Sequence, residues 1–379
     1  MKETAKAGDE FEYGSLKYVI LTTPDGDEAG TVTTKPGVAD NYGNSDLSGK
    51  LVIPSIVNSD GSVYYVTEIG DYGLSGSGVT SVELPETLTA IGASGLRGLS
   101  NIESIKLPDN VESLGVEFLK GCSNLREISF ADGIKITELP RSAFEGTGLA
   151  SVSIPASVTS IGANAFSGCP NIKSITLPSG LTSIGESAFS ECASLKTVVY
   201  LTDSPVKVAA NTFTDYSTPT LYALLSAKDE YEAIEPWRLF ANITWCGVHL
   251  NPVELELFTD DSDRLSATVI LPPGEMAEDI VWLSSNPIVA EVDNDGNVLA
   301  LNRGEAIISA TSGPYSNDCT VVVTENVTTV IDEIITNDSS LVDIFNMQGL
   351  CIKRNVSPEV INSLPSGLYI INGQKVHKR

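Results

Sequence analysis

Five consecutive segments of 23 or 24 residues repeat one pattern through the middle of the chain. The pattern reads x-Φ-P-x-x-Φ-x-x-I-G-x-x-A-F-x-G-C-x-x-Φ-x-x-Φ, where Φ is an aliphatic residue. One such segment exposes an apolar face that only neighbouring segments can bury, so repetition at a fixed period predicts a solenoid. The five segments are 83–105, 106–128, 129–152, 153–175 and 176–198.

Each segment is expected to begin with a short strand and to continue into a tight corner. In the run Ser-Ile-Thr-Leu-Pro at 174–178, alternation points the isoleucine and leucine inward and the serine and threonine outward. Proline then ends the strand, because it cannot donate to a ladder. The pair Ile184-Gly185 predicts a second extended piece, with glycine allowing the corner.

A helical turn at 187–190 completes the expected coil and places Phe189 in the core. The third segment departs most from the pattern, with a small insertion within 132–138 and Thr147 in place of the cysteine. The residues that correspond to Phe189 in the other segments are Leu96, Leu119, Phe144 and Phe166.

Both ends of the stack need covering, because an open end offers unpaired backbone and apolar side chains. Residues 1–82 are expected to form an N-terminal β cap that merges into a degenerate first repeat, with strands at 11–23, 30–34, 51–53 and 63–66. Residues 199–246 are expected to close the other end, with an amphipathic helix at 227–240. The aromatics of this cap predict a plug over the last coil, and an aromatic binding site is the alternative; they are Tyr222, Tyr231, Trp237, Phe240 and Trp245.

The repeats resemble those of the BspA-like leucine-rich-repeat family. Residues 176–198, TLPSGLTSIGESAFSECASLKTV, follow that family's repeat L-P-x-x-L-x-x-I-G-x-x-A-F-x-x-C-x-x-L, and 221–243 are similar to its usual ending. The resemblance covers about 51–245. It implies a secreted or surface-displayed bacterial protein, in a family of which several members adhere to host proteins, and it implies no catalytic residues.

Short strands at about ten-residue spacing follow in 247–324 and predict a β-sandwich. The stretch 281–311 resembles bacterial immunoglobulin-like domains of group 2, which mostly act as spacers. The resemblance implies that Trp282 is the core tryptophan and Asp295-Gly296 a hairpin turn. Asp260-Asp261 replaces the glycine usual before the second strand. The expected strands are 253–257, 266–270, 280–283, 289–292, 297–300, 306–311 and 320–323.

The end of the chain is expected to contain a polar linker, 325–340, and a small β-module, 341–379. The phrases IFNMQG at 344–349 and LPSGLYIINGQKV at 364–376 resemble the C-terminal sorting segments of type IX secretion substrates. That resemblance implies export and surface attachment. A plain terminal β-module is the alternative. The fold class is therefore multidomain: a leucine-rich-repeat solenoid of short parallel strands with helical turns, an all-β immunoglobulin-like sandwich, and a C-terminal β-module.

Charge and hydropathy narrow the classes of partner. The net charge is -26, and a field of that sign repels phosphate backbones and anionic lipids, so we expect no nucleic-acid partner. No apolar run approaches the roughly 18 residues of a transmembrane segment, and MKETAKAGDEFEYG at the N-terminus has no apolar core of a signal peptide. With the domain resemblances, we expect an extracellular or outer-surface location, with the export signal outside this sequence.

Catalytic and metal-binding patterns are weak. Histidine is the usual general base, and neither His249 nor His377 lies beside a serine or cysteine in a nucleophile motif. The acidic run 293–297 invites a calcium-loop interpretation, but its glycine comes too early, so a hairpin turn is favoured. The acidic run 260–263 likewise predicts a solvated turn first and a cation site second. We therefore expect no enzyme, no cofactor and no metal.

Three of the six cysteines occupy one position of the repeat. Equivalent positions stack in a solenoid, so Cys122, Cys169 and Cys192 are expected to be buried small apolar residues. A bridge between Cys169 and Cys192 is the alternative.

The outward strand positions remain as the candidate binding surface. If the strands stack, these residues form two rows, which Thr197 and Val199 would continue. The sequence predicts a non-catalytic adhesin that binds a host or matrix protein through this face; a glycan-binding surface protein is the alternative. Small hydroxyl residues in the rows are also what any strand surface carries. The candidate residues are Ser81, Glu83, Ser104, Lys106, Glu127, Ser129, Ser151, Ser153, Ser174 and Thr176.

Overall fold

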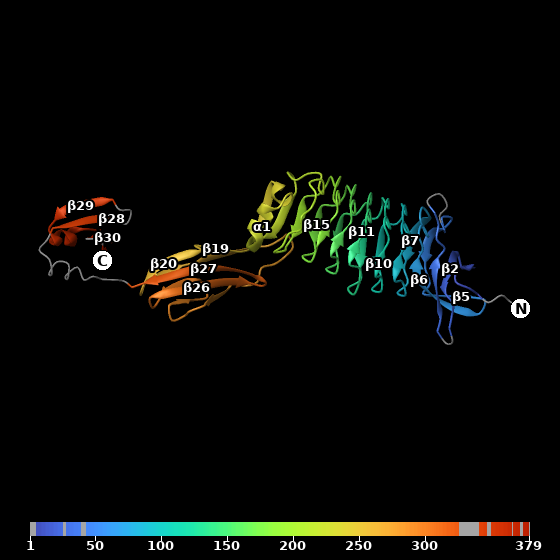
Figure 1. Ribbon diagram of the computed structural model, residues 1–379, viewed down its shortest axis with the longest axis horizontal. Coiled ribbons are helices and arrows are strands. Elements are labelled where there is room, and N and C mark those ends of the chain that lie inside the picture. The colour runs from blue at the N-terminus through green and yellow to red at the C-terminus, as the bar shows by residue number, and fades with distance from the viewer. Residues whose placement is uncertain are drawn as a thin grey trace. The chain divides into compact units, whose positions relative to one another are not determined.

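Figure 1 shows the computed structural model of the chain. The structure describes residues 5–25, 28–38, 43–325, 341–346, 350–365, 367–371 and 374–378. They divide into two compact units, Met1–Gly247 with Ile270–Met276, and Val248–Val269 with Ala277–Arg379. Each unit is described by itself. Nearly all of the expected linker 325–340 lies outside the described residues.

A curved sheet begins the first unit and covers the end of the stack. The run expected as one strand at 11–23 is a hairpin of two, because Gly14 turns the chain with a φ of 64°. The second strand of the hairpin pairs with an antiparallel neighbour, which in turn pairs in parallel with the first strand of the solenoid. The strands are β1 (Glu10–Tyr13), β2 (Leu16–Thr22), β3 (Gly30–Thr34), β5 (Ile56–Ser59) and β6 (Ser62–Ile69), whereas β4 (Ser48–Val52) pairs in parallel with the strand Gly78–Glu83 instead.

The coils up to β16 each contribute a long strand to one side of the stack and a two-residue strand to another (Figure 1). The long-strand ladder, in which β7 does not pair with β9 nor β11 with β13, comprises β7 (Gly78–Glu83), β9 (Ser104–Leu107), β11 (Glu127–Phe130), β13 (Ser151–Ser153), β15 (Ser174–Leu177), β17 (Thr197–Tyr200), β18 (Thr220–Leu224) and β19 (Asn242–Asn251). The short-strand ladder continues β6 with β8 (Ala90–Ile91) and β10 (Ser113–Leu114) and, after a break, comprises β12 (Glu138–Leu139), β14 (Ser160–Ile161) and β16 (Ser183–Ile184). In β15 the predicted alternation is confirmed, since Ile175 and Leu177 are buried and Ser174 and Thr176 exposed.

The third side of every coil is a tight turn, and we call the stack of these turns the turn column. Residues 187–190 close through single i→i+3 bonds, Ala188 N to Gly185 O at 3.3 Å and Ser190 N to Ser187 O at 3.1 Å. Ser187 has a φ of 55°, a left-handed conformation that a regular helix does not contain. The expected helical turn is therefore a tight non-helical turn. Coils join here through backbone bonds such as Phe166 N to Ala188 O at 2.8 Å.

A stack of phenyl rings fills the core behind the turn column. Neighbouring ring centroids lie 5.0 to 5.5 Å apart, a spacing at which aromatic contact is favourable. Phe118 supplies the ring in the second segment, one residue before the expected Leu119. The stacked residues are Phe118, Phe144, Phe166, Phe189 and Phe213.

The repeated glycine after the second strand serves close approach of the coils rather than a corner. A Cβ on Gly185 would lie 2.3 Å from the backbone nitrogen of Ala163 in the preceding coil. Gly162 and Gly115 meet the preceding coil in the same way, at 2.5 Å and 2.3 Å. Any larger residue therefore forces adjacent coils apart.

The closing cap differs from prediction in its helix. The helix expected at 227–240 is broken into η1 (Leu225–Ala227), α1 (Lys228–Ala233) and η2 (Trp237–Leu239). Pro236 explains the break, because proline lacks an N–H and disfavours helical geometry in the residue before it.

The aromatic plug forms in part. Tyr231 and Trp237 are fully buried, and Trp237 Nε1 donates to Val206 O at 2.7 Å. Phe240 packs with them, 6.2 Å from Trp237 between ring centroids. Trp245 is half-buried beside Tyr231, whereas Tyr222 lies instead on the outer face of the long-strand ladder.

The second unit contains a two-sheet β-sandwich. One sheet orders its strands β20-β27-β26-β23 and the other β21-β25-β24. Trp282 is half-buried against the core rather than wholly inside it, and it packs over Gly296 in the predicted hairpin turn. The strands of the two sheets are β20 (Glu254–Phe258), β21 (Ser262–Arg264), β23 (Val281–Ser284), β24 (Ala290–Val292), β25 (Asn297–Ala300), β26 (Gly304–Ser312) and β27 (Tyr315–Thr324), whereas β22 (Ser266–Ile270) pairs with β19.

The last described residues form a small antiparallel sheet ordered β29-β28-β30-β31. Ile344, Ile361 and Ile371 are its buried centre. Its elements are β28 (Val342–Asn346), β29 (Cys351–Val356), η3 (Pro358–Ser363), β30 (Gly367–Ile371) and β31 (Gln374–Lys378).

Candidate functional site

All ten candidate residues lie on the outer face of the long-strand ladder. Nine are exposed and Ser81 is half-buried. Their inward neighbours in the same strands, such as Ile105 and Ile175, are buried and fix which face each side chain takes. The face is therefore a consequence of the alternation within each strand.

Backbone register brings these residues together in three groups. Ser104 lies opposite Glu127 and Lys106 opposite Ser129, between β9 and β11. Ser151 lies opposite Ser174 and Ser153 opposite Thr176, and the second row continues through Val199 to Tyr222. Ser81 and Glu83 pair with Lys50 and Val52 of β4, not with β9. The rows that the sequence predicts are thus present, but they are not continuous.

A groove interrupts the face between β11 and β13. These two strands do not pair, and a space of about 440 Å³ opens where they part. Two candidate residues, Ser129 and Ser153, line it together with apolar side chains that the sequence reasoning missed. The signal for the groove is the extra length of the third segment. The lining is Ile128, Ser129, Phe130, Ala131, Asp132, Ile134, Ser153, Pro155, Ala156 and Ser157.

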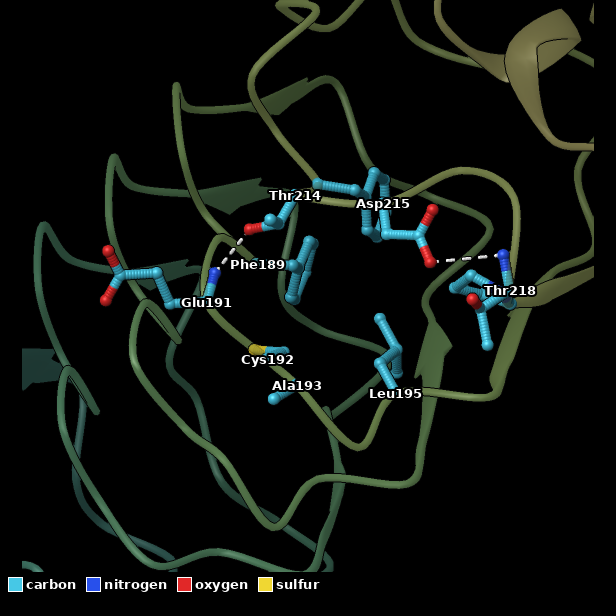
Figure 2. Close-up of a pocket in the computed structure, with 10 residues that line it drawn as sticks. Phe189, Glu191, Cys192, Ala193, Leu195, Thr214, Asp215 and Thr218 are labelled. Carbon is cyan, nitrogen blue, oxygen red and sulfur yellow. Dashed lines mark hydrogen bonds between the residues drawn. The ribbon is translucent and has the colours of Figure 1, made fainter.

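A smaller cavity, of about 150 Å³, lies beside the end of the phenyl stack (Figure 2). Two carboxylates line it, Asp215 and Glu191. Hydrogen bonds from Thr218 and Ser217 lower the pKa of Asp215 to about 2. The carboxylate therefore stabilises the turn that it belongs to, and with so low a pKa it is a poor general base. Burial raises the pKa of the Cys192 thiol, also in the lining, to about 12, which keeps it protonated. The cavity offers no acid–base or nucleophilic pair.

The cysteines of the repeat are structural. All are free, so the alternative bridge between Cys169 and Cys192 is wrong. Each thiol donates instead to a carbonyl of the preceding coil: Cys122 to Leu96 at 3.3 Å, Cys169 to Phe144 at 3.1 Å and Cys192 to Phe166 at 3.2 Å.

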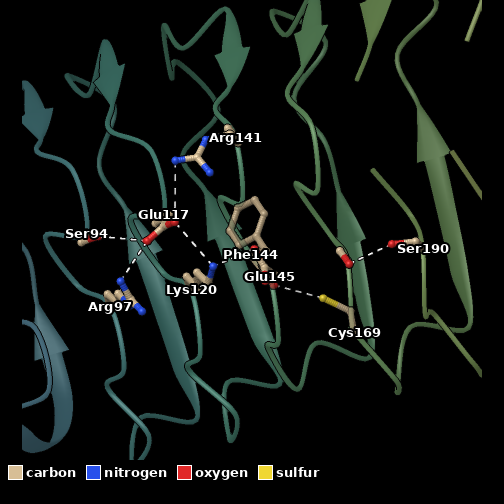
Figure 3. A network of polar contacts seen from close by, with 10 residues as sticks. Ser94, Arg97, Glu117, Lys120, Arg141, Phe144, Glu145, Cys169 and Ser190 are labelled. Atoms are coloured by element: carbon tan, nitrogen blue, oxygen red, sulfur yellow. Dashed lines mark hydrogen bonds and ion pairs between the residues drawn. The ribbon is translucent and has the colours of Figure 1, made fainter. Parts of the chain in front are cut away.

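A cluster of charges on the turn column links three coils (Figure 3). Glu117 accepts from Arg97 at 3.0 Å and lies 3.5 Å from Lys120 and 3.7 Å from Arg141. Lys120 also reaches Glu145 at 3.0 Å. Every charge has an opposite partner, so the cluster fastens coils to one another; sequence reasoning missed it.

Other predicted chemical sites resolve into turns. Asp293 accepts hydrogen bonds from Asp295 N and Asn297 N at 2.9 Å each, as the hairpin interpretation predicts. Asp260 takes a φ of 68°, the left-handed conformation for which a glycine is usual. His249 lies in β19, and the side chain of His377 is outside the description. Among the residues that the structure describes, no group of three or more His, Cys, Asp or Glu side chains is arranged to hold a metal ion.

Comparison with family models assigns both main parts of the chain. Residues 63–149 and 137–224 match the BspA type leucine rich repeat region, in six copies. Residues 247–323 match the bacterial Ig-like domain of group 2. The protein is therefore multidomain, with BspA-type leucine-rich repeats followed by an Ig-like domain. Both families are typical of bacterial surface proteins and are typically non-catalytic. In the described part of the chain, no helix has the length and hydropathy of a membrane span.

Two curated proteins share part of the sequence. An uncharacterized protein of Clostridium acetobutylicum is 34% identical over 96 residues, which are 24% of this chain and 23% of that protein. Ice-binding protein 1 of Shewanella frigidimarina is 30% identical over 112 residues, 26% of this chain and 13% of that protein. The chain thus matches less than a quarter of the length of either relative.

Solved structures with partial similarity include a vaccine antigen and two leucine-rich proteins. The pneumococcal vaccine antigen PcpA is 14% identical with a TM-score of 0.31, over 64% of this chain and 99% of that one. The Treponema pallidum protein TpLRR is 20% identical with a TM-score of 0.31, over 55% and 87%. A leucine-rich cell surface protein of Faecalibacterium prausnitzii is 16% identical with a TM-score of 0.27, over 64% and 96%.

Proposed function

We propose that the protein is a secreted or surface-exposed bacterial adhesin that binds a host or matrix protein through the outer face of the long-strand ladder. One observation carries the proposal: exposed, register-aligned side chains form an open face that a groove with apolar lining interrupts. Protein interfaces concentrate their free energy in a few side chains buried in pockets, surrounded by flatter contacts. The groove is the pocket in this proposal, and the exposed residues of the two rows are the flatter contact surface around it.

The groove has the chemistry for an apolar anchor with polar edges. Phe130 and Pro155 are half-buried in its lining, so covering them removes further apolar surface from water. The hydroxyls of Ser129 and Ser153 stand at the same opening and can donate to or accept from a partner's backbone. We propose that a large apolar side chain of the partner protein occupies this space.

Glycan binding is the second candidate function, and one residue favours it. Tyr222 continues the second row and is half-buried, so part of its ring faces outward beside Val199 and Thr244. Carbohydrate sites commonly stack a sugar on an aromatic ring. Tyr222 is the only aromatic residue in the described rows, which leaves the protein partner as the better-supported proposal.

We also propose that the C-terminal module serves export or attachment. Its support is the likeness of the phrases at 344–349 and 364–376 to type IX sorting segments, together with the compact sheet that the described residues of 341–378 form. Residues 347–349, 366, 372 and 373 of those phrases lie outside the described residues.

Binding of the full chain to panels of extracellular-matrix proteins and of polysaccharides tests the adhesin proposal. The variant Ser153→Arg with Ser174→Arg places two bulky charges on the face, on neighbouring coils. Its matched control is Ser113→Arg with Ser183→Arg, two exposed serines of the short-strand ladder. We expect the first variant to lose matrix-protein affinity by about tenfold or more, which is about 1.4 kcal/mol, and the control to bind like the parent. Equal binding by both variants, or binding to polysaccharides alone, would contradict the proposal.

A further inference from the structure

Two consecutive ladder steps are missing around the third coil, which comprises β11, β12 and the turn at 141–146. The short-strand ladder stops between β10 and β12, and the long-strand ladder stops between β11 and β13. A cut through the chain between β11 and β12 crosses both missing steps and, between them, the turns of the second and third coils. The other missing step of the solenoid, between β7 and β9, is isolated, because β6, β8 and β10 pair on both sides of it.

Two extra residues in the third coil account for the gap. Ile134 N donates to Ala131 O at 3.1 Å, as Leu181 N does to Pro178 O at 3.3 Å in a regular coil. In the regular coil Thr182 follows directly and its N donates to Thr159 O at 2.8 Å. The corresponding residue of the third coil is Thr137, whose carbonyl accepts from Thr159 N at 2.8 Å, while the bond to the coil before starts from Lys135 N and reaches Val111 O at 3.3 Å. Regular coils therefore have no equivalent of Lys135 and Ile136, which lie between these anchor points. Such an insertion displaces both flanking strands from their neighbours.

A proline removes a further bond at the same place. Gly115 N donates to Ile91 O and Gly162 N to Leu139 O, each at 2.7 Å, so this position ties every regular coil to the one before it. The third coil has Pro140 there, which has no N–H to donate. Both the two-residue insertion and the missing N–H of the proline thus interrupt the short-strand ladder.

The turn column remains intact between the two missing steps. Glu117 N donates to Arg141 O at 2.9 Å, and Gly121 N donates to Glu145 O at 2.7 Å. Ion pairs from Glu117 to Arg141 and from Lys120 to Glu145 cross the same boundary (Figure 3). The coils are held firmly along one side. On the two flanks the strands do not pair, and single backbone bonds remain, Lys135 N to Val111 O and Ala150 N to Arg126 O, each at 3.3 Å.

We propose that this boundary is a built-in joint of the solenoid, with the turn column as its pivot. Segments with fewer backbone hydrogen bonds open at lower free energy than the rest of a fold, and around the third coil two consecutive ladder steps are missing. Opening separates Ser129 from Ser153 and widens the groove between them. The residues before and after the joint otherwise remain two rigid stacks. The joint exists whether or not the face binds a protein.

Distances between spin labels on the full chain test the joint. One pair, Lys106→Cys with Thr176→Cys, spans three coil steps of the second row and crosses it. The control pair, Ser153→Cys with Tyr222→Cys, spans three paired steps of the same row. Three steps are about 14 Å between backbones for regular strands. A Cys351→Ser background removes the one native cysteine that is not buried.

We expect the pair across the joint to give a longer mean distance and a broader distribution than the control pair. Deleting Lys135 and Ile136 and adding Pro140→Gly makes the third coil regular, and the distribution should then narrow to that of the control. Equal distributions for the two pairs in the parent chain would overturn the proposal, whether or not the shortened coil folds. An unchanged broad distribution in a folded shortened coil would also overturn it.

Discussion

Left-handed backbone recurs at two positions of each turn in the turn column, and at the second of them glycine supplies it in five of the six turns. Gly76, Gly98, Gly121, Gly146 and Gly168 have φ between 64° and 76°. The sixth turn has Glu191, with a φ of 58°. A residue with a Cβ costs roughly 1–2 kcal/mol of conformational free energy in this left-handed conformation. Glu191 therefore lowers the stability of its turn, whereas the glycines at the same position of the other turns do not.

Replacing this residue by glycine should therefore stabilise the solenoid. We expect Glu191→Gly to raise the free energy of unfolding by about 1 kcal/mol, measured by urea denaturation. The bond from its backbone N–H to Thr214 Oγ1 does not depend on the side chain and should remain. Gly168→Ala, the reverse change one coil earlier, should lower stability by a similar amount. A Glu191→Gly chain less stable than its parent would refute this account of the turn.

The sequence predicts the elements of the coils well, because each is set by local alternation and by one period. It predicts the caps less well. Gly14 splits one expected strand and Pro236 breaks one expected helix, and both residues were visible in the sequence. The groove is different in kind. The insertion in the third coil is visible, but its effect on pairing depends on how β11 meets two other strands, which local patterns do not encode.

Close approach of neighbouring coils makes a prediction at the scale of the element. A Cβ on Gly162 would lie 2.5 Å from Arg141 N, whereas one on Gly180 would meet nothing within 4 Å. We expect Gly162→Ala to lower the free energy of unfolding by about 1–3 kcal/mol, because the short-strand ladder must shift to admit the methyl group. Gly180→Ala should be neutral or stabilising by up to about 1 kcal/mol, through the unfolded state. Thermal unfolding of both variants checks this, and equal losses would contradict it.

For the whole molecule, the sequence predicts the order of domains because each contains its own repeat or family pattern. The two rows of the candidate face follow from the period alone, since equivalent positions stack. What the sequence does not predict is where the rows are interrupted, and the groove with Phe130 and Pro155 lies at one of those interruptions. The candidate site therefore combines a predictable surface with an unpredicted pocket.

The central claim, that the solenoid face is the recognition surface, is tested most directly by hydroxyl-radical footprinting of the full chain. The partner is the matrix protein that binds most tightly in the panel. Phe130 in the groove and Tyr222 in the second row report on the face, and Met276 and Leu283, 91% and 67% exposed, report on surface outside it. We predict that the partner protects Phe130 and Tyr222 and leaves Met276 and Leu283 reactive. Protection of Met276 and Leu283 without Phe130 and Tyr222 would contradict the account.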